Sequence, residues 1–367
     1  MTLANPWIHG PETGENFYNL PPNLLGVETK IVYIGAIHPL HKKRFTFNLL
    51  GSNKGREGIV MAPVAAGLMH SPFETLYSEG PYQVGAIPER TDWKKRTITF
   101  GVHVNPDIEP WDSDGRLIDT PFRYRMIEER WWGSWSSTED GYLGMWTRTH
   151  GWRWLRVRLA EDSKTAFDLD PVAYGNNFMT WDMQAVACQP FWCKPTVTAE
   201  WQNTVDTSTL WSLIEDLLNE FIHGLHVGEG VIRVPNRGDR SVYPRFLVSS
   251  PGNAWIKEGD RWVELPLFTP QDGWVLVDTD PNSQTLTAAN DPVDPYVMKI
   301  LRNSQLLDML LHDILSSTEP VWQRMEDRFT EASQIPPRTL AHIGVRHSNA
   351  DGKIIAFVPQ RYEKGFG

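Results

Sequence analysis

Several stretches in the first half of the chain alternate apolar and polar side chains. In 97–104 every second residue is apolar (Ile98, Phe100, Val102 and Val104), and the run stops at Asn105-Pro106. Segments 45–49, 155–160 and 178–187 alternate in the same way, and 31–37 is a short continuous apolar run. A period of two is typical of strands with one buried face. These stretches predict a first half built from β-strands.

Helical periodicity occurs in four places. The segment 121–132 begins with Pro121, which suits the first position of a helix, and its apolar residues fall three or four apart. The segment 207–222 carries an apolar stripe, with Ser208 as its cap. We also predict helices over 296–315 and 321–332. The first of these has an apolar face broader than one small domain should need.

The second half returns to strand patterning between about 230 and 286. Turn pairs such as Pro251-Gly252 and Asp272-Gly273 separate short strands, a spacing that suggests a sandwich. A last strand pair, 341–348 and 353–360, surrounds a turn at 349–352. The sequence therefore predicts a mainly β protein with two β-sandwich domains, a few helices and a helical C-terminal extension.

Length and charge restrict the function. A chain of 367 residues is too long for one ordinary core, so two or three domains are expected. The net charge of −10 and the pI near 5.6 argue against sequence-specific nucleic-acid binding. We find no signal-peptide pattern and no apolar run of the ~18 residues that a membrane span needs, so we expect a soluble protein without a membrane anchor.

The aromatic and sulfur-containing residues leave alternatives open. Seventeen Trp residues fit sugar-binding faces, protein interfaces or the cores of large sandwiches, of which the core is the most common use. The two cysteines, Cys188 and Cys193, are too few for a disulfide framework or a four-cysteine zinc site. We expect them to be buried free thiols.

No residue pattern predicts an active site. His223 and His226 have a helical spacing that some zinc sites use, but no third ligand is evident. Asp278, Asp280 and Asn282 resemble the start of a calcium loop that then lacks its required glycine and glutamate. Glu128 and Glu129 are adjacent and cannot form a glycosidase pair, and no nucleophile elbow, phosphate loop or dinucleotide fingerprint occurs. We therefore predict no catalytic residues, no metal, no cofactor and no enzymatic activity.

A short basic patch follows the first predicted strand. His38, His41, Lys42, Lys43 and Arg44 lie within seven residues of one another. They fit either a solvated loop or an ionic contact with an acidic neighbouring subunit, and the sequence does not separate these two interpretations.

The order of several motifs resembles a known family. The motifs are "KKRTITFGVHV", a helix, "GYLGMWTRTHGWRWLRVRL", "PFW", "GEGVIRVPNRGDRSVYPRFLVSSPG" and "WVLVDTDPNSQTL". Together they resemble the distal tail protein (siphovirus tail component) of long-tailed, non-contractile bacteriophages. The segment "HSNADGKIIAFVPQRYEKGFG" is similar to minor tail proteins of phages that infect actinobacteria. The resemblance covers roughly residues 30–290, and the helical stretches 207–222 and 291–335 depart from the minimal family pattern.

The resemblance implies a domain organisation. It gives an N-terminal ring-forming β domain at 1–205 and a galectin-like sandwich at 227–290, and the helical periodicity adds a connecting helix at 206–226 between them. A helical extension at 291–340 and a strand pair at 341–367, completing the second domain, follow. The turn signature of the second domain would be Asn236, Gly238, Asp239, Pro244 and Asp278. This assigns the Arg237-Gly238-Asp239 tripeptide to a turn, for which Gly and Asp are suited, rather than to cell adhesion.

The resemblance also implies a function. The chain would be a structural virion protein of the tail tip, a baseplate component that forms a hexameric ring between the tail tube and the hub and supports host recognition. Its partners would be other copies of itself, the tail tube protein, hub and tip proteins and, as a further candidate, the tape measure protein, with assembly in the host cytoplasm. A ring needs heterologous, closing interfaces, which sheet edges and Trp-rich faces can supply.

Two further surfaces are predicted. Leu301, Leu307 and Leu311 form a candidate assembly face, which would pack on a neighbouring subunit, on the hub or on this chain's own sandwich. The alternative function is a carbohydrate-binding, receptor-binding module of the tail tip, with Trp255 and Trp262 as the sugar-facing aromatics.

Overall fold

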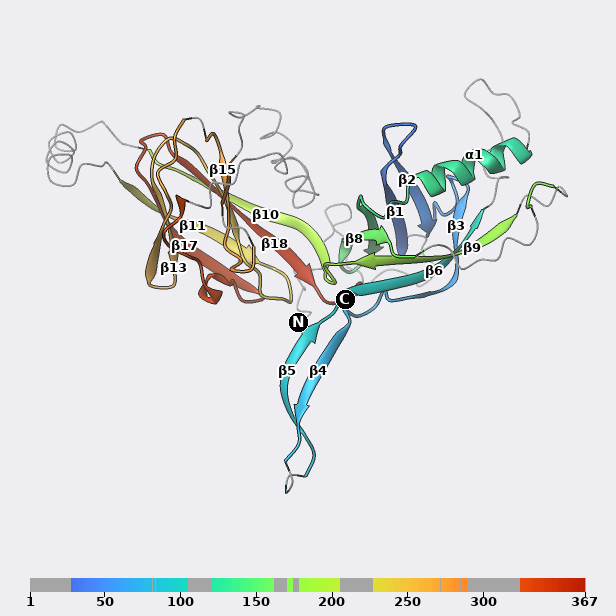
Figure 1. Cartoon of the computed structure of the whole chain (residues 1–367), viewed down its shortest axis with the longest axis horizontal. Coiled ribbons are helices and arrows are strands. Elements are labelled where there is room, and N and C mark those ends of the chain that lie inside the picture. Colours follow the sequence, from blue (N-terminus) through green and yellow to red (C-terminus); the bar gives the residue numbers. More distant parts are fainter. Residues whose placement is uncertain are drawn as a thin grey trace, which may run out of the picture. The chain divides into compact units, whose positions relative to one another are not determined.

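The computed structural model describes residues 28–80, 82, 84–104, 120–161, 170–173, 178–204, 227–270, 272–283, 286–288 and 324–366. The described chain is mainly β, as the sequence predicts (Figure 1). It divides into two compact units, one of Met1–Cys193 with Glu363–Gly367 and one of Lys194–Tyr362. The sequence places the first domain boundary at residue 205, whereas the structure divides the two units between Cys193 and Lys194. Within the described residues, no helix has both the length and the apolar character to cross a membrane.

Unit 1 curls a sheet around an aromatic core. The strands are β1 (Lys30–Ile37), β2 (Arg44–Leu50), β3 (Ile59–Ala66), β6 (Arg96–Val104), β7 (Gly141–Thr147), β8 (Gly151–Leu159) and β9 (Met179–Ala187). Their order is β2-β1-β7-β8, and the sheet continues through β9 and β6 to β3. The strand predictions at 31–37, 45–49, 98–104, 155–160 and 178–187 are confirmed.

Helix α1 (Thr120–Gly133) fills the inside of this sheet, where the sequence predicts a helix. Its buried residues Tyr124, Ile127 and Trp131 face the core. The ring of Tyr33 stacks on Trp135 at 4.0 Å between centroids and meets the edge of Trp131 at 5.7 Å. Four tryptophans of this unit are buried, so part of the high Trp content serves the core, as expected from its most common use.

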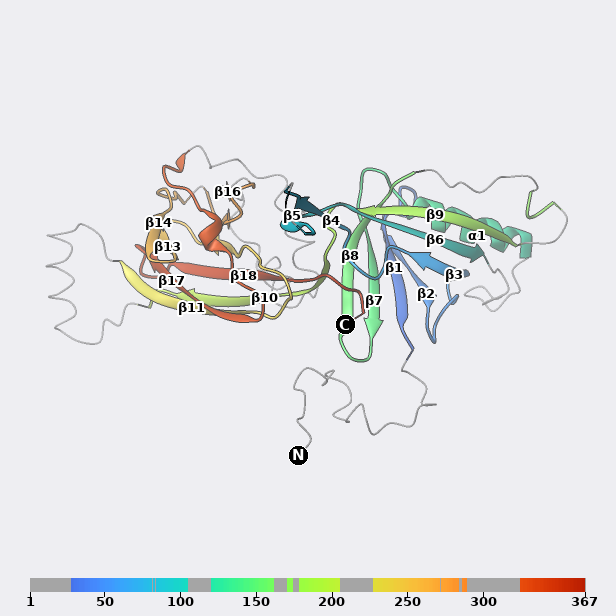
Figure 2. The same cartoon turned by 90° about the horizontal axis from the view of Figure 1, so that it is seen from below.

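A two-stranded sheet stands apart from these strands. It consists of β4 (Phe73–Ser78) and β5 (Ile87–Trp93), which pair only with each other (Figures 1 and 2). We call this hairpin the ribbon. The sequence analysis contains no prediction for it.

Unit 2 is a sandwich of two sheets. One sheet has the order β16-β15-β12-β18-β10, formed by β10 (Trp192–Gln202), β12 (Arg245–Val248), β15 (Val275–Asp278), β16 (Leu286–Ala288) and β18 (Lys353–Tyr362). The other has the order β11-β17-β13-β14, formed by β11 (Gly228–Asn236), β13 (Ala254–Glu258), β14 (Arg261–Glu264) and β17 (Thr339–His347). Alternate residues of both sheets form one apolar core that includes Phe246, Val277 and Val345.

Four predictions for the second half of the chain have different outcomes. The predicted last strand pair is confirmed as β17 and β18. The helix predicted over 321–332 is wrong in its described part, because 324–332 contains only short 3-10 turns, such as that at Glu331–Ser333 (η4). The predicted helices at 207–222 and 296–315 lie outside the described residues.

Both cysteines are free thiols, as predicted, but their predicted burial is wrong. Cys188 is exposed and Cys193 is half-buried. Their neighbours Ala187 and Trp192 are fully buried and occupy the core instead of the cysteines.

Candidate assembly site

The ribbon has two sides of different chemistry. Its register pairs Phe73 with Trp93 and Thr75 with Thr91, and alternation along β4 places Tyr77 on the same side. None of these residues carries a charge. A register shift between Leu76 and Tyr77 follows, at which Glu89 has no partner in the register. Phe73 is 58% exposed and Tyr77 is 61% exposed, so large aromatic groups on this side face solvent. We call it the uncharged side of the ribbon.

The opposite side of the ribbon is charged. It carries Glu74 opposite Asp92 and Leu76 opposite Arg90. Arg90 pairs with Asp92 at 2.9 Å, and Glu74 pairs with the ammonium of Lys94 at 3.1 Å. These exposed ion pairs keep this side in water, so the two sides of one hairpin differ as the two faces of a half-buried strand usually do. Among the described residues, β4 and β5 pair with no other strand, and at the base of the uncharged side Phe191 packs against Trp93 with ring centroids 5.1 Å apart.

A buried arginine fixes the base of the ribbon. Arg96, at the start of β6, is 1% exposed, and its five N–H donors can all be accounted for. They meet five oxygens at 2.8–3.2 Å, which are the main-chain carbonyls of Gly67, Leu68, Pro190 and Glu363 and the hydroxyl of Ser71. We call this group the Arg96 cage. It joins the segments that enter and leave the ribbon to β6 and to the segment after β18.

The Arg96 cage holds a cation without a carboxylate among these five acceptors. Burial lowers the pKa of Arg96 to about 10, which still leaves it charged at neutral pH. Its guanidinium also lies 5.6 Å from the ring centroid of Trp192, a cation–π contact. Because main-chain carbonyls cannot ionise, this anchor should hold the ribbon equally well over a wide range of pH.

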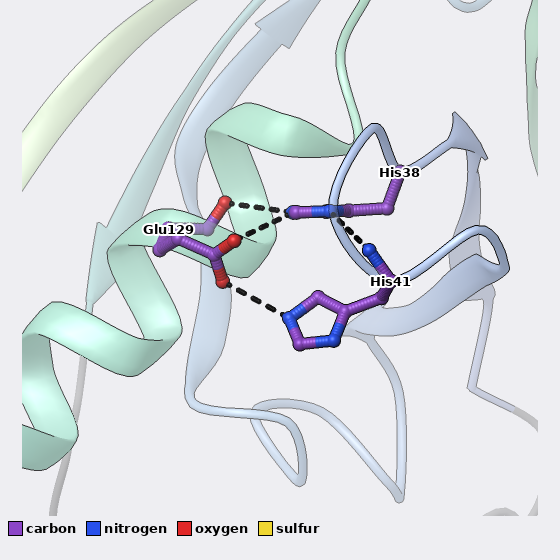
Figure 3. Close-up of side chains that lie close together, drawn as sticks. All are labelled: His38, His41 and Glu129. Carbon is purple, nitrogen blue, oxygen red and sulfur yellow. Dashed lines mark hydrogen bonds and ion pairs between the residues drawn. The ribbon is translucent and has the colours of Figure 1, made fainter.

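A second polar cluster joins α1 to the turn after β1. Figure 3 shows His38, His41 and Glu129, the His38 cluster, with both imidazoles directed at one carboxylate. Nε2 of His38 lies 3.1 Å from Oε1 of Glu129, and Nε2 of His41 lies 3.4 Å from its Oε2. Gly133 makes this approach possible, because a Cβ there would lie 2.0 Å from Nε2 of His38.

The hydrogen bonds of His38 determine its protonation pattern. Its Nδ1 accepts the main-chain N–H groups of Leu40 at 3.2 Å and His41 at 3.4 Å, so the neutral ring carries its proton on Nε2. A metal bound at Nε2 would force that proton onto Nδ1, against two N–H donors. The His38 cluster therefore suits charge-assisted hydrogen bonding better than metal binding, although three ligand atoms lie within 4.8 Å.

These contacts bear on the predicted basic patch. His38 is 1% exposed and therefore not part of a solvated loop. Its acidic partner, Glu129, belongs to this same chain. Lys42 and Lys43 remain exposed on the same turn.

The predicted turn signature of unit 2 lies around the end of β11. Asn236 is 1% exposed, and its amide donates to the carbonyls of Arg240, Ile335 and Pro336 at 2.8–3.0 Å. Its Oδ1 accepts the N–H of Gly238 at 3.0 Å, and Asp239 donates its N–H to the carbonyl of Arg361. One amide side chain thus holds the segment after β11 against the segment before β17.

The rest of the signature extends this arrangement. Gly238 is buried, and a Cβ there would lie 2.5 Å from the carbonyl oxygen of Arg361, so only glycine fits without displacing β18. The carbonyl of Pro244 accepts the hydroxyl of Thr279 at 2.7 Å, and Asp278 pairs with Arg245 at 3.0 Å. In the described structure these residues hold the polypeptide together, and a buried glycine is poorly placed to meet an adhesion receptor.

The two predicted sugar-facing aromatics lie on the outer side of the four-stranded sheet. Trp255 stands opposite Arg346 on β17 and Glu264 on β14. The guanidinium of Arg346 covers the ring of Trp262 at 4.0 Å and is itself paired with Glu229 at 2.8 Å. A sugar stacking on that side of Trp262 would have to displace Arg346. Their role in sugar binding stays a prediction.

The predicted assembly face of Leu301, Leu307 and Leu311 lies outside the described residues, as do His223 and His226. The sequence analysis also missed the ribbon. Its uncharged side could have been recognised from the alternation of Phe73, Thr75 and Tyr77. The bulge between Leu76 and Tyr77 and the proline at 88 interrupt the pattern over such a short hairpin.

Comparison with known proteins gives a likeness of fold only. No protein-family model matches the chain, and none of the curated proteins matches its sequence. The structure resembles the SPP1 Dit (gp 19.1) protein, described as a paradigm of the hub adsorption apparatus in phages that infect Gram-positive bacteria. It is 10% identical over 90% of this chain and 98% of that one, with a TM-score of 0.42. The baseplate of phage P2 in its activated conformation with Ca (9% identity, 90% and 98% covered) and the corresponding structure with Sr (10% identity, 89% and 97% covered) each give a TM-score of 0.46. Because these TM-scores are below 0.5, none of the likenesses assigns a function.

Proposed function

We propose that this chain is a structural protein of the tail tip of a long-tailed, non-contractile bacteriophage. In this proposal several copies form a ring, six of them by the family pattern, which joins the tail tube to the hub or baseplate and supports host recognition. The chain works as a virion component and not as an enzyme. It assembles in the host cytoplasm with its own copies, the tail tube protein and the hub proteins, with the tape measure protein as a further candidate partner.

The observation that carries the proposal is the uncharged side of the ribbon. A two-stranded hairpin is marginally stable in water by itself, and it becomes stable when an apolar side packs on another element. Phe73 and Tyr77 remain more than half exposed, while the Arg96 cage fixes the base of the same hairpin. A firmly anchored hairpin with exposed aromatic groups is a typical means of joining subunits.

The order of motifs in the sequence supports the same proposal independently. The strand "KKRTITFGVHV" is β6, at the foot of the ribbon, and "GYLGMWTRTHGWRWLRVRL" is the β7–β8 hairpin. Within the family pattern this first domain forms the ring. The placement of the ribbon on unit 1 agrees with that assignment.

The test is the assembly state of the purified full chain. Light scattering after size exclusion should give a closed oligomer, and negative-stain images should show rings with six-fold symmetry. Replacing both aromatic groups of the uncharged side (Phe73→Ser with Tyr77→Ser) should leave a folded monomer, because the contact loses its apolar area.

The matched control is Leu76→Ser, which removes an apolar group from the charged side of the same ribbon and should leave the oligomer intact. A wild-type chain that stays monomeric at every concentration, and that does not join purified tail tubes, would contradict the proposal.

A further inference from the structure

A second surface of unit 1 has the chemistry to receive the ribbon. It lies on the outer side of β7 and β8, where the register pairs Gly144 with Trp154 and Trp146 with Trp152. The alternate residues of β8, Leu155 and Val157, are buried in the core. The three tryptophans therefore share the side that faces away from the core. We call this surface the tryptophan face.

The tryptophan face is flat and close-packed. The rings of Trp152 and Trp154 stack, with centroids 5.3 Å apart and an angle of 21° between the planes. Trp154 lies over Gly144, where a Cβ would come within 2.5 Å of the ring, so only glycine allows this position. The ammonium of Lys30 lies 4.9 Å from the ring centroid of Trp146. All three rings are half-buried, which leaves part of each available to a partner.

The charges bordering the tryptophan face are mainly positive. Arg156 follows Trp154 on the same side of β8, Arg158 comes next, and both bind the single carboxylate of Asp140. With Lys30 this makes three cations against one carboxylate, in a chain whose net charge is −10. The pKa of Asp140 shows the same balance. Burial would raise it, but hydrogen bonds from Arg158 and Arg156 lower it overall.

The ribbon has the opposite charge. Between Phe73 and Lys94 it contains Glu74, Glu79, Glu89 and Asp92 against Arg90 and Lys94, four carboxylates against two cations. Its uncharged side presents Phe73 and Tyr77, and its charged side lies directly behind them. An aromatic centre with a rim of charges is the usual composition of a protein interface, in which Trp, Tyr and Arg contribute most of the binding free energy.

We propose that the ribbon of one copy packs with its uncharged side on the tryptophan face of the next copy. This inference rests on the proposed function, because it names the partner surface of the proposed ring. Aromatic pairs form the centre of the contact, and the carboxylates of the ribbon meet Lys30, Arg156 and Arg158 at its rim. Since the two surfaces differ, the contact is heterologous, and repeating it closes a ring when the rotation between neighbouring copies divides a full turn.

Two other outer faces fit the ribbon less well. The outer side of β6 and β9 presents Thr97, Thr99, Asp182 and Gln184 along most of its length. Its aromatic contact, His103 stacked on Phe178 at 5.3 Å, lies at one end of the two strands. The outer side of the four-stranded sheet of unit 2 has tryptophans, but Arg346 covers Trp262 and is already paired with Glu229. The tryptophan face combines three aromatic rings with three cations against one carboxylate.

A site-specific photo-crosslink tests this contact in the full chain. Tyr77 is replaced by p-benzoylphenylalanine, the oligomer is irradiated, and the covalent dimer is cut from a denaturing gel and digested with trypsin. Cleavage after Arg148, Arg153 and Arg156 releases the peptides 149–153 and 154–156, which contain Trp152 and Trp154. We expect the crosslink in these two peptides.

The possible results separate the two proposals. Crosslinks that map to unit 2 or to β6 and β9, or an oligomer that gives no covalent dimer, would overturn the docking contact while leaving the ring intact. A chain that forms no oligomer would overturn both.

A pair of variants provides a second readout. Trp152→Gln should weaken association of the copies at least tenfold in sedimentation, because it removes an aromatic group from the centre of the contact. Trp262→Gln, which alters the outer face of unit 2, should leave association unchanged. Equal association of wild type and Trp152→Gln would count against the docking contact.

Discussion

The sandwich of unit 2 and the ribbon of unit 1 are both antiparallel, but they place their apolar side chains in opposite environments. In the sandwich, Phe246 and Val277 face a second sheet and are fully buried. In the ribbon, Phe73 and Tyr77 face solvent from a hairpin that pairs with no other strand of the described chain. The same alternation of apolar and polar residues therefore builds a buried core in the sandwich and leaves an exposed apolar surface on the ribbon. Alternating apolar residues thus contribute to folding where they are buried within the chain, and they are available for association where they are exposed. Measuring how each substitution changes the free energy of unfolding and the association of copies tests this distinction.

The largest effect is expected in the sandwich core. Phe246→Ala should lower the free energy of unfolding by about 3–5 kcal/mol, because it removes a fully buried aromatic ring and leaves a cavity. Denaturant unfolding followed by tryptophan fluorescence measures this loss. Val231→Ala, on the outer side of the same unit and 55% exposed, is the control and should change little. A loss below about 1 kcal/mol for Phe246→Ala would show that this core is loosely packed.

The Arg96 cage should give the next largest effect. Arg96→Met keeps most of the side-chain volume but removes five hydrogen bonds, at a total cost of about 2–4 kcal/mol. Ser71 and Trp192 still donate to the carbonyls of Pro190, Glu363 and Leu68, which limits this cost. Limited proteolysis should then cut at the base of the ribbon sooner than in wild type, which would tie the stability of the ribbon to this one residue. Lys95→Met, at the exposed neighbouring position, should have neither effect. Unchanged proteolysis in Arg96→Met would mean that the ribbon is anchored by other contacts.

A smaller, pH-dependent effect is expected at Asp272 in unit 2. Hydrogen bonds from Arg324, outweighing burial, lower the pKa of this carboxyl from 3.8 to about 2. A lowered pKa means that Asp272 stabilises the fold above about pH 4 and that this contribution is lost as the pH falls towards 2. Because Arg324 is 44% exposed and screened by solvent, we expect the contribution to be about 1–2 kcal/mol.

Unfolding curves at several pH values test this expectation. Asp272→Asn should be less stable than wild type at pH 7 and should lose less stability between pH 4 and pH 2. Asp260→Asn, at an exposed turn, is the control and should follow the wild-type curve. Parallel curves for Asp272→Asn and wild type would contradict the assignment to Asp272.

The smallest effect on unfolding is expected on the uncharged side of the ribbon. Tyr77→Ser should change the free energy of unfolding of the monomer by no more than about 0.5 kcal/mol, because Tyr77 is already exposed. Denaturant unfolding at a concentration where copies are dissociated is the measurement. A loss above about 1 kcal/mol would show that Tyr77 packs within its own chain, and the contrast with Phe246 would disappear.

The sequence predicts correctly those strands and helices whose apolar residues are mainly buried in the core. β6, β9 and α1 each bury one stripe of side chains, so the period of their apolar residues identifies them. β1 is buried on both faces and is identified by its continuous apolar run. The prediction fails where the pattern has another cause. The apolar residues of 321–332 gave a false helix, because Met325 and Phe329 reach the core of unit 2 from an irregular segment. Helical spacing and an extended path that touches a core at intervals can look alike in sequence.

The candidate site was harder to predict than the fold. Arg96 lies in the strand that the sequence identified best, yet its five acceptors come from three segments distant in sequence, and four of them are main-chain carbonyls. Every residue has a main-chain carbonyl, so the sequence does not show which carbonyls will accept a hydrogen bond from a buried side chain. Glu129 likewise pairs with histidines 91 and 88 positions earlier, a contact that only the fold reveals.

The path of the chain between the two units has a consequence for how such a protein can change. Residues 363–366 return to unit 1, where the carbonyl of Glu363 accepts from Arg96, so unit 2 is an insertion between two segments of unit 1. An inserted module can be exchanged for another while the surrounding unit keeps its own contacts. The part that would hold a ring together and the part free to diversify are thus separable at two points of the backbone, one on each side of unit 2.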